Sequence, residues 1–148
     1  MGILDVDNSF TFNKATGAKN QTLPASTPFV STNIIDIAGA AKDVGPGNPI
    51  MVLIQITGTP TAGSCAGLTF TLQTDTVEAL SSPTELWSVT IPIASVTQGQ
   101  QIWMPVPINA ERYMRLSCVE ETAALGAADG TYFAGVQLDA QQGFAHTF

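Results

Sequence analysis

The chain has 148 residues, of which 45% are hydrophobic and only 11% are charged, and its net charge is −7. This length allows a single domain with one sizeable core. The negative charge excludes sequence-independent nucleic-acid binding, which depends on Lys and Arg neutralising phosphates, and it disfavours anionic membrane surfaces. No apolar run reaches the length of a membrane span. Because freely diffusing proteins normally carry more charge, this composition favours a subunit that packs against other proteins.

The first part of the chain, residues 1–28, predicts an N-terminal arm followed by a connector. Apolar and polar residues alternate only briefly there, and from residue 13 onward the segment is polar and punctuated by Gly and Pro. Phe10 and Phe12 fall on the same side of an extended segment, so some surface must cover that side.

Residues 29–139 predict one domain of short strands, and residues 140–148 predict a C-terminal tail. The expected strands are 29–37, 50–57, 68–74, 86–91, 93–96, 101–106, 112–119 and 131–139. The segment 50–57 is almost entirely apolar, which indicates a strand buried on both faces at the centre of a sheet. Pro92 marks an edge or a bulge, and residues 58–67 predict a flexible loop of small residues.

The strand at 112–119 is the most informative stretch. With a two-residue period, one of its faces is apolar and consists of Met114, Leu116 and Cys118. The segment also holds Arg112 and Arg115, although the whole chain has only five basic residues. Cations this scarce are expected in ion pairs that position the last strands or a subunit interface.

The predicted fold class rests on two observations, the lack of a helical pattern and the regular spacing of turn residues. Apolar residues nowhere recur at helical spacing over three turns, whereas turn residues recur about every ten residues. This pattern predicts an all-β fold, an antiparallel β-sandwich of jelly-roll type with about eight strands and with extended N- and C-terminal arms.

Residues that could carry chemistry are few. Cys65 and Cys118 could form a disulfide, but reduced thiols are favoured because nothing marks the chain as secreted. The lone His146 lies near the end of the tail, so it lacks the rigid support that nucleophilic catalysis requires. Three acids, Asp75, Glu78 and Glu85, are interpreted as a solvated loop, with an acid pair or calcium site as the alternative. Four aromatic residues could line a sugar-binding face, although core packing explains them equally well: Trp87, Trp103, Tyr113 and Tyr132. We expect no enzymatic activity, no cofactor and no metal.

Several segments together resemble the jelly-roll cement (decoration) proteins of tailed, chiefly short-tailed, bacteriophage capsids. The resemblance is carried by the segments 31–37, 42–45, 49–56, 68–74, 112–116 and 134–139. Each segment alone is generic strand sequence, and their order and spacing over roughly residues 30–140 supply the specificity.

The resemblance implies a structural virion protein that is made in the host cytoplasm and sits on the outer surface of the capsid. Such a protein clamps neighbouring major capsid protein subunits and associates with itself as a homodimer or homotrimer, without binding nucleic acid or membrane. Contacts to the capsid or to other subunits are expected from Ile3, Leu4, Phe10, Phe12, Arg112, Arg115, Phe144, His146 and Phe148. The alternative function is a carbohydrate- or receptor-binding β-sandwich module of a phage particle.

Overall fold

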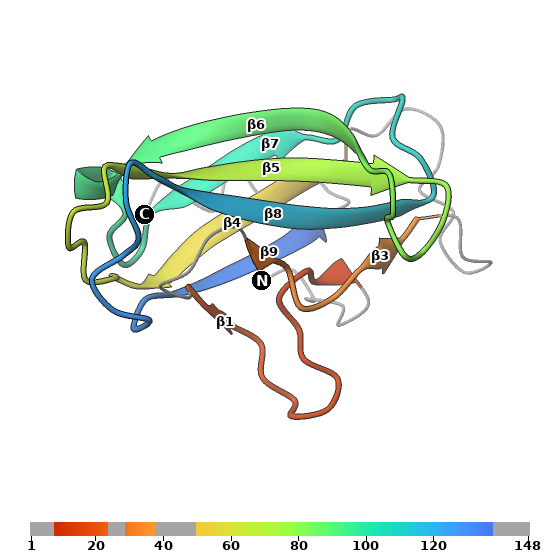
Figure 1. The fold of residues 1–148 in the computed structure, drawn as a ribbon. Helices are drawn as coiled ribbons and strands as arrows, with labels where there is room; N and C mark the ends of the chain where they lie inside the picture. Colours follow the sequence, from red (N-terminus) through yellow and green to blue (C-terminus); the bar gives the residue numbers. More distant parts are fainter. Residues whose placement is uncertain (1–7, 24–28, 38–49, 138–148) are drawn as a thin grey trace, which may run out of the picture.

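The computed structural model describes residues 8–23, 29–37 and 50–137, which form two antiparallel sheets (Figure 1). Sheet A has the strand order β1-β9-β4-β7, and sheet B has the order β2-β8-β5-β6 with β3 also paired to β8. The strands are β1 (Gln21–Thr22), β2 (Phe29–Val30), β3 (Ile35–Asp36), β4 (Met51–Gly58), β5 (Gly67–Asp75), β6 (Thr84–Pro92), β7 (Gln101–Pro105), β8 (Tyr113–Glu121) and β9 (Thr131–Gln137).

The strand order is that of a jelly roll. Because β2 and β3 follow one another along the same partner, β8, they act as one interrupted strand. The chain then forms a long hairpin in which β1 pairs with β9, β2 and β3 with β8, β4 with β7, and β5 with β6. Rolling this hairpin up adds the β4–β9 and β5–β8 pairs. The predicted all-β sandwich is confirmed.

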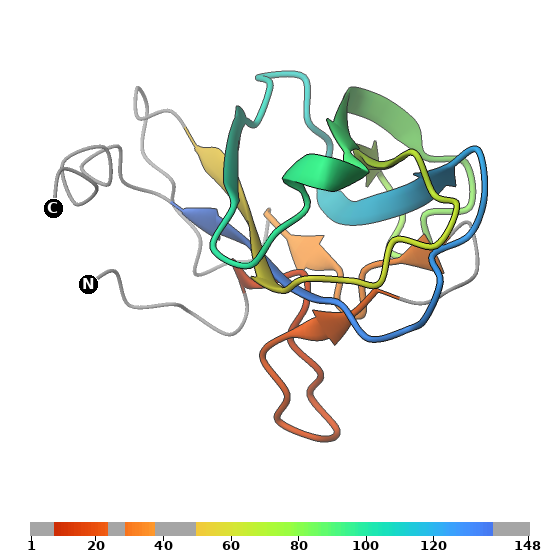
Figure 2. The ribbon, with the colours of Figure 1, turned by 90° about the vertical axis from the view of Figure 1, so that its left-hand side faces the viewer.

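The core lies between the two sheets, which face each other in Figure 2. Sheet A contributes Val52, Ile54, Ile56, Tyr132, Ala134 and Val136, and sheet B contributes Leu68, Phe70, Leu72, Met114, Leu116 and Cys118. The positions on β8 are the apolar face predicted for segment 112–119. Each fully buried Val, Leu, Ile, Phe or Met side chain in this core stabilises the fold by about 1.5–3 kcal/mol. The predicted central position of β4, between β9 and β7, is also confirmed.

The predicted strand at 29–37 is interrupted after two residues. At the interruption, Ser31 binds the backbone of β8 partly through its side chain. Its N–H donates to Leu116 O at 2.7 Å, and its Oγ accepts the N–H of Leu116 at 3.0 Å. The alternation nevertheless continues across the break, because Phe29 and Ile35 pair with inward-facing residues of β8.

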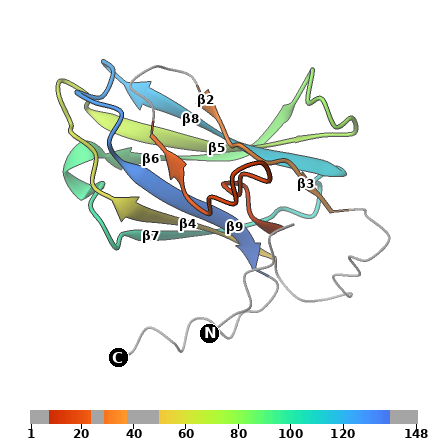
Figure 3. The same cartoon turned by 90° about the horizontal axis from the view of Figure 1, so that it is seen from below.

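The N-terminal segment belongs to the sandwich, so the predicted arm over residues 1–28 is wrong for residues 8–23. Phe10 N–H donates to Ala134 O of sheet A, and Phe10 O accepts the N–H of Asn33, next to sheet B. Leu23 and Phe10 are fully buried in the core. Figure 3 shows this segment lying along the edge of the sandwich, beside β9. It closes the edge between the two sheets.

Two further segments, 93–96 and 58–67, differ from their predicted structure. Residues 93–96 do not form a strand: they contain the short 3₁₀ helix η2 (Ile93–Ser95), in which Val96 N–H donates to Ile93 O at 3.0 Å. The loop at 58–67 is anchored rather than free, because Thr61 N–H donates to Asp129 Oδ1 at 2.8 Å and Thr61 O accepts the N–H of Gly126.

Candidate interaction surfaces

Arg112 forms the predicted ion pair within its own chain. Its Nε and Nη2 donate to the two carboxylate oxygens of Asp36 at 3.0 and 2.9 Å, and its guanidinium lies 4.9 Å from the centroid of the Tyr113 ring. Hydrogen bonding to Asp36 raises the pKa of Arg112. Because Asp36 pairs with Tyr113 in the register of β3 and β8, the ion pair ties β3 to the start of β8. Such an exposed pair adds little stability, so its main role is to position the strands.

The outer face of sheet B is mostly polar, although Val30 and Val119 are exposed on it, and several of its polar side chains bind one another. Arg115 Nε donates to Gln73 Oε1 at 2.8 Å, and the ion pair expected for Arg115 at a subunit interface stays a prediction. Thr69 Oγ1 donates to a carboxylate oxygen of Glu121 and lies 2.7 Å from Thr90 Oγ1. Because several of these groups already bind one another, a partner on this face would gain only from the groups that these hydrogen bonds leave unused.

Of the other predicted contact residues, the structure describes only Phe10 and Phe12. Ile3, Leu4, Phe144, His146 and Phe148 lie outside the described residues. Phe10 has an exposed fraction of 0% within its own chain, so its assignment as a contact to a neighbouring chain is wrong. Phe12, two residues along, is half-buried and keeps part of its surface accessible.

Both cysteines are free and buried, in agreement with the favoured reduced state. Burial, with a further contribution from the charge of Glu120, raises the pKa of Cys118 far above its usual value. A thiol that stays protonated is a poor nucleophile. Among the described residues, no group of His, Cys, Asp and Glu could hold a metal ion, and no helix is long and apolar enough to cross a membrane.

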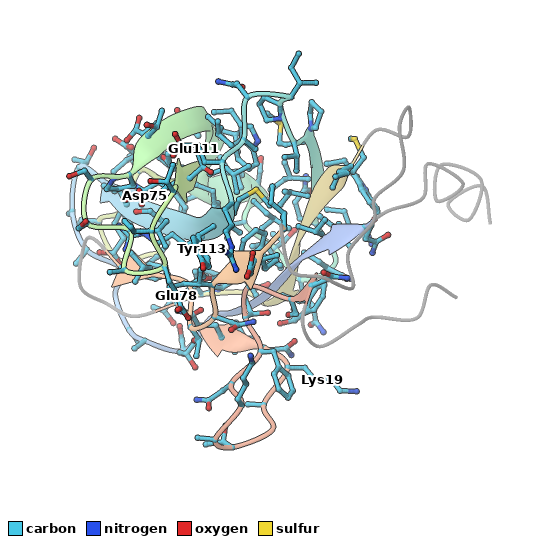
Figure 4. The ribbon with its side chains drawn as sticks, turned by 90° about the vertical axis from the view of Figure 1, so that its right-hand side faces the viewer. Lys19, Asp75, Glu78, Glu111 and Tyr113 are labelled. Atoms are coloured by element: carbon cyan, nitrogen blue, oxygen red, sulfur yellow. The ribbon has the colours of Figure 1, made fainter. Side chains whose placement is uncertain are left out.

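Asp75 and Glu78 of the predicted solvated loop lie at one end of the sandwich, where Figure 4 shows them with Glu111 on the side that carries Tyr113, whereas Glu85 lies in β6. Asp75 is not solvated: its residue is 6% exposed, and its carboxylate accepts the N–H groups of Val77 and Ser82, each at 3.2 Å. The hydrogen bond from Val77 is the main cause that lowers the pKa of Asp75, against the opposing effect of burial. Asp75 therefore fixes the β5–β6 loop.

The lowered pKa of Asp75 predicts acid sensitivity. Its stabilising contribution is fully present above the unfolded-state pKa of about 3.9, and it is lost as the pH falls through the lower pKa of the folded state. We expect Asp75→Asn to be less stable than the wild type at pH 7 and to lose less further stability on acidification below about pH 4. Urea unfolding at a series of pH values measures this difference. Glu85→Gln, at an exposed position on β6, is the control, and an unchanged pH profile in Asp75→Asn would contradict the assignment.

The outer face of sheet A carries an apolar strip. The burial of its Leu53 agrees with the prediction that segment 50–57 is buried on both faces, whereas its residues on β7 and β9 were not predicted. Leu53 pairs with Trp103 of β7 on one side and with Gly135 of β9 on the other. A Cβ atom on Gly135 would lie 3.1 Å from Phe133 Cζ, so the ring of Phe133 lies against Gly135, next to Leu53. Leu53 and Phe133 are 6% and 8% exposed although they point away from the main core, and Trp103 is half-buried. We call Trp103, Leu53 and Phe133 the apolar strip.

The aromatic residues do not form the exposed cluster that a sugar-binding face would need. Tyr132 is fully buried and its ring lies 5.5 Å from that of Phe70, and Trp87 packs against the core. Trp103 and Tyr113 lie on different sheets. The four residues therefore serve mainly in packing, each at a separate place.

The described residues thus define a jelly-roll sandwich with a mostly polar outer face on sheet B and with Leu53 and Phe133 buried on the outer side of sheet A. Residues 18–136 match the model of the Bbp16 family, a phage-related family, and the chain belongs to this family. Among solved structures, the crystal structure of PirA is similar, with a TM-score of 0.41 and 13% sequence identity over 83% of this chain and 95% of that chain. No curated protein sequence matches the chain.

Proposed function

We propose that this protein is a capsid cement protein, a non-enzymatic virion component that binds the outside of a bacteriophage shell and clamps neighbouring major capsid protein subunits. Its membership in a phage-related family and its jelly-roll fold support this proposal. Copies made in the host cytoplasm would associate as homodimers or homotrimers and then attach to the shell. Attachment at many lattice positions makes weak single contacts sufficient through avidity.

The observation that carries the proposal is the position from which the two chain ends leave the sandwich. Ser9 bridges to Gly135, two residues before the end of β9 at Gln137. The first and last described residues, Asn8 and Gln137, therefore lie close to the same end of β9. Two segments that leave from one place can engage one partner surface together. In our proposal these contacts are made by Ile3, Leu4, Phe12, Phe144, His146 and Phe148.

Binding to purified shells that lack the protein tests the function. The full chain should co-sediment with the shells and raise their resistance to heat, whereas a variant lacking residues 1–7 should bind more weakly and keep its own melting temperature. The deletion stops at residue 7 because Phe10 and Thr11 are fully buried and a longer deletion would damage the core. Failure of the full chain to bind shells would refute the proposal. Binding to a glycan array without binding to shells would favour the carbohydrate-binding alternative.

A further inference from the structure

The outer face of β8 has a cation near one end and a carboxylate at the other. Its outward-facing side chains are, in chain order, Tyr113, Arg115, Ser117, Val119 and Glu121, and the side chains between them are buried. Arg115 and Glu121 are separated by roughly 20 Å along the strand, so they cannot meet within one chain. Neither of them forms an ion pair with any of the described residues.

Both charged side chains keep atoms that no described residue binds. Arg115 reaches Gln73 with Nε, and its two terminal nitrogens donate to none of the described residues. Glu121 accepts the hydroxyl of Thr69 with Oε1, and its Oε2 accepts from none of them. Arg115 and Glu121 are half-buried. A partner that covers this face must therefore supply an opposite charge at each end, because a covered ion without a counter-ion loses its hydration uncompensated.

The centre of the same face is uncharged and carries two exposed valines. Val119 is 37% exposed and Val30 is 45% exposed. Val30 pairs with Ser117 of β8, and on β5 the register partners are Thr69 for Val119 and Thr71 for Ser117. All these side chains are small, so a second sheet can approach the face with its strands nearly aligned, as in other packed pairs of sheets.

This arrangement is complementary to itself. A twofold axis that runs across the strands, midway between Arg115 and Glu121, would lay β8 of one copy antiparallel over β8 of a second. Arg115 of each copy would then lie opposite the partner's Glu121. The same rotation sets Ser117 opposite the partner's Val119, and since Val30 lies beside Ser117, it also brings the exposed valines together. A second copy thus supplies both charges and the apolar groups at matching places.

We infer that two copies of the chain associate through the outer faces of their B sheets, as a twofold dimer with reciprocal ion pairs between Arg115 and the partner's Glu121. The ion pairs fix the register and orientation of the two sheets, and the uncharged centre is excluded from water. The inference rests on the self-association named in the proposed function and selects the dimer. It is tested on the isolated protein, so it can fail independently of shell binding.

Exchanging the two charges tests the dimer. Arg115→Glu and Glu121→Arg each set like charges against each other twice in the dimer, so each should raise the dissociation constant at least about tenfold. The double variant restores opposite charges at the net charge of the wild type and should dimerise within about threefold of it. Glu78→Arg is the matched control, at an exposed position in the loop after β5, and should stay within about twofold. Sedimentation equilibrium at a series of protein concentrations measures each constant.

A valine replacement tests the centre of the face without altering either charged residue. Val119→Lys would place a cation between the two sheets and should weaken dimerisation at least about tenfold. Val77→Lys, at a 49% exposed valine in the loop after β5, is its control and should dimerise within about twofold of the wild type. Both valines are exposed in a single chain, so both variants should fold, and circular dichroism checks this.

A wild type that stays monomeric or has the mass of a trimer would overturn the inference. So would a double variant that dimerises as weakly as the single ones, or a Val119→Lys variant that dimerises as well as the wild type. Co-sedimentation with shells is measured alongside. A wild type that forms this dimer but fails to bind shells would contradict the proposed function alone. Shell binding by a wild type that does not form this dimer would contradict the inference alone.

Discussion

Phe10→Ala should destabilise the protein by about 3–5 kcal/mol, the usual cost of removing a fully buried phenylalanine side chain. Phe10 has no exposed surface, it belongs to the main core, and its backbone binds both Ala134 and Asn33. In a domain of this size, such a loss lowers the melting temperature by roughly 6–20 °C. Thermal unfolding followed by circular dichroism measures the shift.

The matched control for this experiment is Phe12→Ala in the same segment. Phe12 is half-buried and lies outside the main core, so its replacement should cost clearly less. Equal small losses of stability in both variants would show that residues 8–12 are not part of the folded unit. The prediction of an N-terminal arm would then be correct for these residues.

Gly63→Ala should destabilise the protein by roughly 2–4 kcal/mol, a smaller loss than that expected for Phe10→Ala. Gly63 has a φ of +57°, a conformation that costs an L-residue about 1–2 kcal/mol. A Cβ atom at this position would also lie 2.7 Å from both N and Cα of Gly126, and backbone at such a distance must move. The substitution would therefore push apart the loops that follow β4 and β8. Urea unfolding gives the free-energy difference.

Gly17→Ala separates the two causes of this loss. Gly17 has a φ of +74°, but no atom lies within 4 Å of a Cβ atom built there. Its replacement should therefore cost only the conformational term, about 1–2 kcal/mol. Equal losses at Gly17 and Gly63 would contradict the close approach of the two loops.

The parts of the fold that depend on alternation along one strand could be predicted from the sequence. The inward face of β8 was assigned correctly, because neighbouring residues of a strand point to opposite sides whatever the strand pairs with. The same rule places Phe29 and Ile35 on one side of sheet B, although it does not predict the interruption between β2 and β3. That interruption depends on Ser31 meeting Leu116, a contact between residues 85 apart.

The errors concern contacts between distant parts of the chain. Phe10 was taken for an arm residue because nothing near it in sequence reveals the bond to Ala134. Nothing near Arg115 in sequence indicates its hydrogen bond to Gln73, 42 residues away on β5. The apolar strip also joins three strands, although the lack of charge in segments 51–58, 101–105 and 131–137 was a signal that could have suggested it.

The pairing of β1 with β9 has a consequence for the order in which the protein assembles. Gln21 and Tyr132 are register partners 111 residues apart, and β9 also forms one side of β4. A ribosome needs on the order of 10 s to synthesise such a stretch. The local β5–β6 hairpin can form during that time, whereas sheet A must wait for its last strand, because distant pairings close slowly. Sheet A therefore comes into existence only when synthesis has passed β9, so that shorter chains lack its β1–β9 and β4–β9 pairs.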